Sequence, residues 1–159
     1  MPNNRTDTDL EYAGFWIRVW ASLIDAVLIG VIVWPILIAT YGTEYFTSEK
    51  FIAGPIDFLF SYVLPGIAVI LFWIYKSATP GKMAISARIV DARTGGQPSN
   101  GQFIGRYFAY LVSIIPLGLG ILWVAWDRRK QGWHDKLAGT VVVRVKKPRT
   151  ESVAFDKPA

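Results

Sequence analysis

The sequence predicts an all-α membrane protein: a helical transmembrane bundle with a small β-hairpin or sheet on its cytoplasmic side. Hydrophobic residues make up 52% of the 159 residues and charged residues only 18%, which is little charge for a soluble domain. The apolar residues form three blocks, 15–40, 56–75 and 103–126. Each block reaches the roughly 20 residues that a helix needs to cross a bilayer.

The blocks divide the chain into a polar N-terminal segment at 1–12, a membrane domain at 13–145 and a flexible basic tail at 146–159. The N-terminal segment contains three acidic residues, and the apolar run that follows is longer than that of a signal peptide. We therefore expect the first block to remain as the first span and not to be cleaved.

The stretch "GFWIRVWASLIDAVLIG", residues 14–30, covers the first part of the first block and holds Arg18 and Asp25. Arg18 lies near the expected interface, where its side chain can snorkel. If the hydrocarbon begins near Phe15, Asp25 lies about 15 Å into it at the rise of an α-helix, where a carboxylate costs about 2.5 to 3.5 kcal/mol. Ser22, Ala26 and Gly30 repeat every four residues beside the charged face, and small residues at this spacing predict helix packing. Both charges are therefore expected to face protein.

A direct bond between Arg18 and Asp25 is not expected, because helical side chains seven residues apart lean the same way. Asp25 is expected to find a partner on another helix, to contact water or to stay protonated. Arg106 is the favoured cationic partner. The uncharged candidates are Tyr62, Tyr107, Tyr110 and Ser113.

Lysine and arginine place the connections relative to the membrane. The connection 41–55 is acidic and predicted to be external, whereas 76–102 and the segment after residue 126 are basic and predicted to be cytoplasmic. Both flanks of the third block then lie on one side, so we expect this block to break at Pro116 and Gly118 and to re-enter. The alternative is a proline-kinked single span.

Two runs in these basic segments have the composition of strands: "ARIVD" at 87–91, followed by a Gly-Gly turn, and "GTVVVRV" at 139–145. Pairing between them would form a small sheet, and it would require both segments on the same side of the membrane. This is a second reason to expect re-entry of the third block.

The densest polar motif is "WDRRKQGWHDKLAG". Asp127 and Asp135 could receive an ion or proton that passes Asp25, or the motif could be a surface turn whose tryptophans and basic residues meet lipid headgroups. His134 beside Asp135 could transfer protons, although adjacent helical residues point apart. "TPGK" at 79–82 could place Lys82 at an anionic ligand, or it could be a plain turn.

The composition also excludes several kinds of site. The chain has no cysteine and one histidine, so disulfides, thiolate zinc sites and histidine metal clusters are excluded. With no nucleophile and base motif in view, neither an enzyme nor a cofactor is predicted.

The expected partners are the bilayer, anionic lipid headgroups at the cytoplasmic face, and a second copy or a partner membrane protein. Nucleic acid is not expected.

Three motifs together resemble the RDD family of small membrane proteins: "GFWIRVWASLIDAVLI", "TPGKMAISARIVD" and "PLGLGILWVAWDRRKQGWHDKLAGTVVV". The resemblance covers roughly 13–145. It implies that Arg18 and Asp25 are the family arginine and first aspartate, and that the second aspartate is Asp127 or Asp135, with Asp135 favoured. It also implies a role in transport, without a general substrate.

We therefore expect a multi-pass protein of the plasma membrane that is a transporter or an ion- or proton-coupled permease. Its pathway would contain Arg18, Asp25, Arg106, Asp127 and Asp135. The alternative is a structural or accessory membrane subunit that scaffolds a partner protein or lipid.

Overall fold

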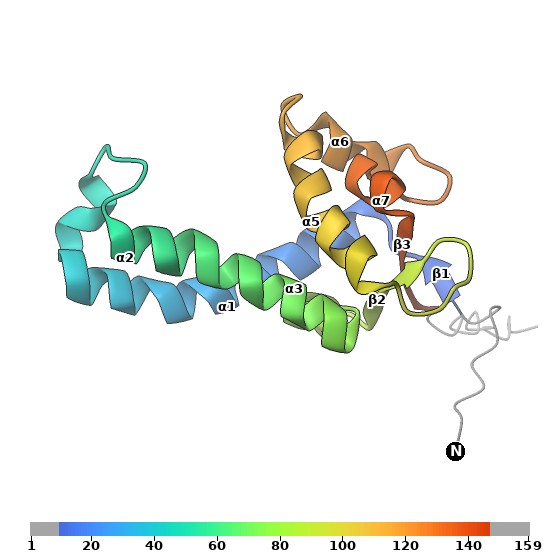
Figure 1. The fold of residues 1–159 in the computed structure, drawn as a ribbon, viewed down its shortest axis with the longest axis horizontal. Helices are drawn as coiled ribbons and strands as arrows, with labels where there is room; N and C mark the ends of the chain where they lie inside the picture. The colour runs from blue at the N-terminus through green and yellow to red at the C-terminus, as the bar shows by residue number, and fades with distance from the viewer. Residues whose placement is uncertain (1–9, 147–159) are drawn as a thin grey trace, which may run out of the picture.

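Two long apolar helical segments dominate the computed structural model, which describes residues 10–146 (Figure 1). The first is α1, Phe15–Tyr41. The second is continuous through α2 (Pro55–Phe58), η3 (Leu59–Val63) and α3 (Leu64–Lys76). Each is long and apolar enough to cross a membrane, so the first two predicted blocks are confirmed as helices. The predicted flexible tail lies outside the described residues from position 147 onward.

The two segments form an antiparallel hairpin, which a 3₁₀ turn, η2 (Thr43–Thr47), helps to close. Asp57 is buried at this end and accepts hydrogen bonds from the Ala53 amide and from the hydroxyls of Tyr45 and Ser61. These bonds attach the connecting loop to the start of the second segment.

The second segment widens into one π-helical turn at η3. Pro65 has no N–H to donate within a helix, and the Leu64 N–H bonds five residues back, to the Leu59 carbonyl. The segment nevertheless continues as a helix to Lys76.

The third block is broken, as the sequence predicts. Helix α5 (Asn100–Ile114) begins at a capping box between Ser99 and Gln102. After the break, α6 (Leu119–Leu122) and η4 (Trp123–Ala125) run at 113° to it. Gly118 adopts a φ of 76° in the break, a conformation that favours glycine. The chain turns so tightly that a Cβ on Gly120 would lie 2.6 Å from the Ser113 Cα.

A small sheet stands at the end of the hairpin opposite the η2 turn (Figure 1). The described strands are β1 (Leu10–Tyr12), β2 (Ala87–Asp91) and β3 (Thr140–Val145), in the antiparallel order β1-β3-β2. The predicted pairing of the two strand-like runs is confirmed, with Arg88 opposite Val143. Strand β1 was not predicted; Glu11 on it forms an ion pair with Arg144 on β3.

Two short helices, α4 (Pro80–Ala84) and α7 (Trp133–Ala138), complete this end. They belong to what we call the sheet end of the molecule: the sheet together with α4 to α7. A core of buried side chains holds it together, and its main members are Ala13, Trp73, Ile89, Phe103 and Val142. This core is therefore packed like the interior of a soluble domain, although α5 and α6 also expose apolar side chains such as Leu111 and Leu119.

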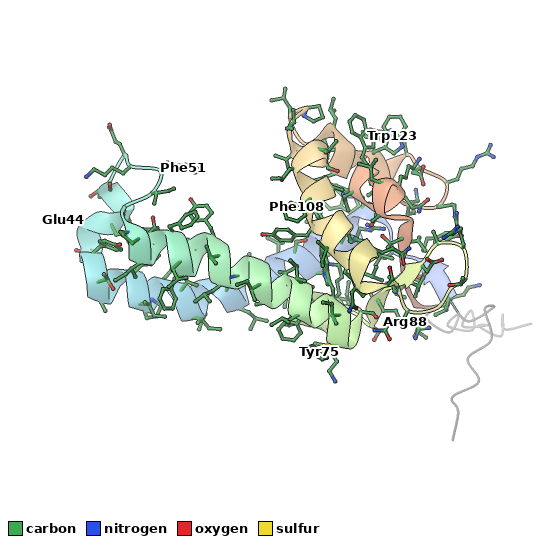
Figure 2. All side chains as sticks on the ribbon, viewed as in Figure 1. Glu44, Phe51, Tyr75, Arg88, Phe108 and Trp123 are labelled. Carbon is green, nitrogen blue, oxygen red and sulfur yellow. The ribbon has the colours of Figure 1, made fainter. Side chains whose placement is uncertain are left out.

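The hairpin exposes apolar side chains along most of its length. In the most apolar stretches of the two long segments only 17% and 11% of the residues are buried. Figure 2 shows Phe51 and Tyr75 projecting from opposite ends of the hairpin, where they are 82% and 76% exposed. Apolar surface of this extent is typical of a face that lipid or another protein covers.

Candidate functional site

Arg18 lies in the first turn of α1 and points into the sheet end. Its Nη1 donates to Asp135 Oδ2 at 2.5 Å, its Nη2 to the Lys130 carbonyl at 2.5 Å and its Nε to the Ala13 carbonyl at 3.0 Å. Its side chain is only 13% exposed. The guanidinium therefore does not snorkel outward as expected, because it binds a carboxylate and two backbone carbonyls inside the protein.

Arg106 approaches the same carboxylate from the other side. Its Nη1 lies 2.5 Å from Asp135 Oδ1 and donates to the Thr140 hydroxyl on β3 at 2.8 Å. The guanidinium is fully buried above the rings of Trp73 and Tyr110, at 5.3 and 5.9 Å. Arg18, Asp135 and Arg106 thus form one unit, the Arg–Asp–Arg cluster, with two positive charges and one negative.

Asp135 is the centre of this cluster and is completely buried. It sits in the first turn of α7, where Oδ2 also accepts the Gly132 N–H at 3.0 Å. Burial alone would raise the pKa of Asp135, but the charges of Arg106 and Arg18 outweigh it and lower this pKa to about 2. Asp135 is therefore a permanently ionised carboxylate at physiological pH.

His134 lies beside the cluster without joining it. Its ring stacks on Tyr110 at 3.9 Å and its backbone N–H donates to Ser113 Oγ. Its Nε2 lies 3.6 Å from Asp135 Oδ1, closer than expected of adjacent helical residues, because the Asp135 carboxylate folds back to the start of α7. Burial lowers the pKa of His134 to about 3, so the imidazole is neutral at physiological pH.

Asp25 does not pair with Arg106, so the favoured cationic partner was wrong. Its carboxylate accepts the Thr79 hydroxyl at 2.5 Å and the Gly81 N–H at 2.7 Å. These donors stand at the start of α4, whose first residue is Pro80. The "TPGK" motif is therefore the start of a helix and not a plain turn.

The uncharged partners that the sequence suggested for Asp25 are engaged elsewhere or lie apart from it. Tyr110 and Ser113 contact His134, and Tyr62 donates to the Phe51 carbonyl. The hydroxyl of Tyr107 lies near Gly66 on α3. Sequence could not single out the Gly81 amide, because every residue except proline carries such a donor.

The two candidate aspartates of the polar motif have different surroundings. Asp127 forms an ion pair with Lys136 at 2.5 Å and accepts the N–H groups of Arg129 and Gln131, outside the cluster. Asp135 alone contacts Arg18 and Arg106. Of the five residues in the expected pathway, three therefore form one cluster, while Asp25 and Asp127 each bind elsewhere.

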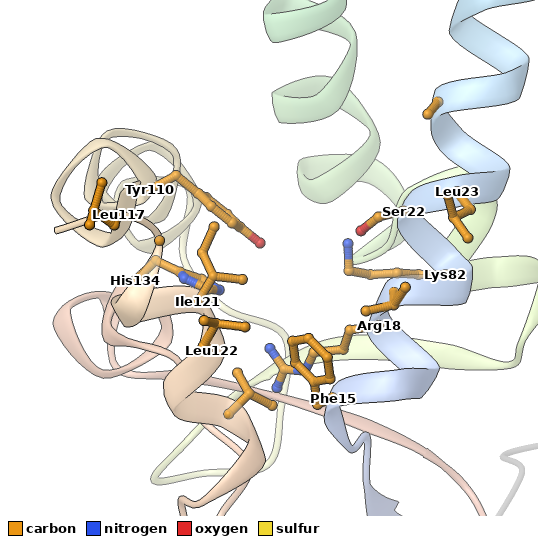
Figure 3. A pocket seen from close by; sticks show the side chains of 14 residues that line it. Phe15, Arg18, Ser22, Leu23, Lys82, Tyr110, Leu117, Ile121, Leu122 and His134 are labelled. Atoms are coloured by element: carbon orange, nitrogen blue, oxygen red, sulfur yellow. The ribbon is translucent and has the colours of Figure 1, made fainter. Parts of the chain in front are cut away.

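A cavity of about 630 Å³ lies between α1 and the sheet end (Figure 3). Ser22 and Ala26, expected to pack against a helix, line it and are exposed, whereas Gly30 is buried. Figure 3 shows Lys82 and Ser22 on one side of the space and Tyr110 and His134 on the other. Lys82 was absent from the expected pathway, although the "TPGK" motif had raised it as a possible anion ligand.

Comparison with known proteins gives one family. A family model described as "RDD family" matches residues 12–139. The uncharacterized protein YxaI of Bacillus subtilis is 31% identical over 147 residues, covering 82% of this chain and 96% of that protein. An uncharacterized protein of Rickettsia prowazekii is 41% identical over 75 residues, 47% of this chain but only 41% of that protein.

A more distant relative extends the comparison. A proline-rich antigen homolog of Mycobacterium tuberculosis is 27% identical over 161 residues, covering 89% of this chain and 67% of that protein. No solved structure matches the chain.

Proposed function

The chain belongs to the RDD family, and on that premise we propose that this membrane protein acts as a structural or accessory membrane subunit. In this role the Arg–Asp–Arg cluster keeps the sheet end in a fixed position on the first span. The sheet end would present a rigid, basic surface to anionic headgroups on the cytoplasmic side of the plasma membrane. The exposed hairpin would contact lipid and a second copy or a partner membrane protein.

The observation that carries this proposal is the burial of Asp135 between two arginines. The cluster and its hydrogen bonds join α1, α5, α7 and β3. Breaking a buried ion pair costs several kcal/mol, typically about 3 to 5, so these elements are held in one arrangement. Because the pKa of Asp135 is lowered to about 2, this carboxylate is unsuited to picking up and releasing a proton near neutrality.

Transport is the second candidate, and the cavity favours it. Arg18, Lys82 and Ser22 line a space of about 630 Å³, and ionisable residues within membrane proteins commonly mark substrate or ion pathways. In this role Asp25 would bind the transported ion or proton, and Arg18 and Asp135 would be further charged sites along its path. The two candidates make different predictions for Asp25.

The variant Asp25→Asn distinguishes the accessory role from the transport role. In proteoliposomes with an imposed proton or sodium gradient, the accessory role predicts that the wild type and Asp25→Asn both leak no faster than protein-free vesicles. Glu44→Gln, which changes an exposed carboxylate on η2, is the matched control, and thermal unfolding checks that each variant is folded. The proposal fails if the wild type and Glu44→Gln carry a saturable flux that the folded Asp25→Asn lacks.

Cysteine labelling gives a second readout, since the natural chain has no cysteine. Single cysteines at positions 22, 25 and 29 would be treated with a water-soluble thiol reagent in intact membranes. Protection of positions 25 and 29 supports the accessory role, because their surroundings are then dry. Labelling of both would reveal an aqueous path along α1 and favour transport.

A further inference from the structure

Lys82 is a buried cation with no carboxylate in direct contact among the described residues; the nearby Asp25 carboxylate is reached only through the Thr79 hydroxyl, which it accepts at 2.5 Å. The residue is 8% exposed, and its Nζ makes one long hydrogen bond, 3.5 Å to Thr79 Oγ1. Among residues 10–146, no carboxylate lies within ion-pair distance of this nitrogen. Burial lowers the pKa of Lys82, because an ammonium group away from water is stable only with hydrogen-bond acceptors or a counter-charge.

The ammonium borders the cavity and faces other polar groups across it. Figure 3 shows the Lys82 nitrogen between the hydroxyl of Ser22 and that of Tyr110. Arg18 also lines the space, and no acidic side chain does so among the described residues. The Arg18 guanidinium is already bound to Asp135 and two carbonyls, so Lys82, with the two hydroxyls, supplies the polar part of the cavity. An ammonium group beside hydroxyl donors suits a phosphate or a carboxylate.

The rest of the wall is apolar and leads out to the apolar surface of the molecule. Its apolar members are Phe15, Val19, Leu23, Ala26, Leu117, Ile121, Leu122 and Val124. Leu23 and Leu117 are 50% and 95% exposed, so the cavity opens where lipid would cover the protein. A volume of about 630 Å³ is in the usual range for small-molecule sites, roughly 300 to 1,000 Å³.

We propose that this cavity binds an anionic single-chain amphiphile, with its phosphate or carboxylate head at Lys82 and its acyl chain along the apolar wall. A small free anion would leave the apolar part of the space unfilled, and an uncharged lipid would leave Lys82 without a directly bound counter-charge. The site is independent of whether the chain acts as a subunit or as a transporter, since binding alone requires no movement of the ligand.

The test is equilibrium binding of radiolabelled palmitoyl-lysophosphatidate to the full chain in phosphatidylcholine nanodiscs. We expect saturable binding that neither palmitoyl-lysophosphatidylcholine nor millimolar inorganic phosphate displaces. Lys82→Met should weaken it about tenfold or more, as loss of a charge-assisted hydrogen bond does, and Lys82→Arg should retain it. Lys76→Met, at an exposed lysine that ends α3, is the matched control and should bind like the wild type.

Ala26→Trp provides a variant that leaves the charges intact and fills the cavity, and it should abolish binding. Thermal unfolding and size-exclusion chromatography would confirm that the variants are folded. The proposal is overturned if folded Lys82→Met or Ala26→Trp binds with wild-type affinity. It is also overturned if lysophosphatidylcholine competes equally, which would indicate a purely apolar site, or if inorganic phosphate displaces the probe, which would indicate a free-anion site.

Discussion

Asp135 carries the single negative charge between two guanidinium groups, and each of these groups depends on it differently. Arg18 has two backbone carbonyls as further acceptors. Arg106 has only the Thr140 hydroxyl besides Asp135, and its Nε and Nη2 are buried without a hydrogen-bond partner in the described part of the chain. Removing the negative charge would therefore leave Arg106 as a buried cation supported mainly by the faces of Trp73 and Tyr110.

Asp135→Asn should consequently lower the free energy of unfolding by about 3 to 5 kcal/mol, the usual cost of removing one partner from a buried ion pair. Asp127→Asn is the matched control in the same motif. Its pair with Lys136 is partly exposed, with Lys136 44% accessible, so the loss should be within about 1 kcal/mol. Thermal or denaturant unfolding of both variants in one detergent measures the difference.

Equal stability of the two variants would show that the cluster is not a structural connection. Adding Arg106→Met to Asp135→Asn should recover part of the lost stability, because the double variant no longer buries an unpaired guanidinium. A double variant less stable than Asp135→Asn alone would contradict this explanation.

The short helix α4 shows how one glycine allows two elements to meet. A Cβ on Gly81 would lie 2.0 Å from the Ala21 carbonyl oxygen and 2.9 Å from the Asp25 Cγ. The first of these atoms is backbone and cannot move aside cheaply. The same close approach brings the Gly81 N–H and the Thr79 hydroxyl to Asp25 and holds Lys82 at the cavity.

Gly81→Ala should therefore push α4 away from α1, destabilise the fold and weaken amphiphile binding at Lys82. Gly105→Ala, on an exposed turn of α5 where the added Cβ would meet open space, is the control. It should keep or raise the stability by up to about 1 kcal/mol, because alanine favours a helix more than glycine does. Unfolding temperatures of the two variants that coincide would refute the role assigned to Gly81.

At the scale of the whole molecule, the acidic connection 41–55 and the predicted basic segments lie at opposite ends. Figure 2 shows Glu44 at the hairpin turn and Arg88 at the sheet, far apart along the long axis. The sheet joins residues 10–12, 87–91 and 140–145, so the predicted basic segments lie at one end of the molecule. The break after Ile114 turns the third apolar block back to that end, as pairing of β2 with β3 requires.

This arrangement predicts a specific labelling pattern in membrane vesicles. A cysteine at Arg93, in the connection after β2, and one at Lys146, after β3, should react with an impermeant thiol reagent only from the cytoplasmic side. A cysteine at Ser48, in the loop that closes the hairpin, should react only from the outside. Reaction of positions 93 and 146 from opposite sides would require a third complete crossing, and the re-entrant topology would then be wrong.

Much of the fold could be read from local patterns. The two long helices follow from the length of their apolar runs, the break from Pro116 and Gly118, and the β2–β3 pair from two β-branched runs. Strand β1 escaped prediction because three residues are too few for a periodic pattern, and it exists through pairing with Val143 to Val145. Arg18 faces the protein interior, as predicted from the sequence. The sequence did not identify its partner, Asp135, which lies 117 residues further along the chain.

By itself, the sequence determined that this protein has two helices able to span a membrane, a broken third block, a pair of strands and a set of charges too costly to leave in lipid. Those properties depend on composition and on neighbours within a few residues. Only the tertiary structure decided that Arg106 pairs with Asp135, that Asp25 binds a backbone amide, and that Lys82 borders a cavity. These contacts depend on how distant elements meet in space, and several residues of suitable charge or hydrogen-bonding type were available for each role.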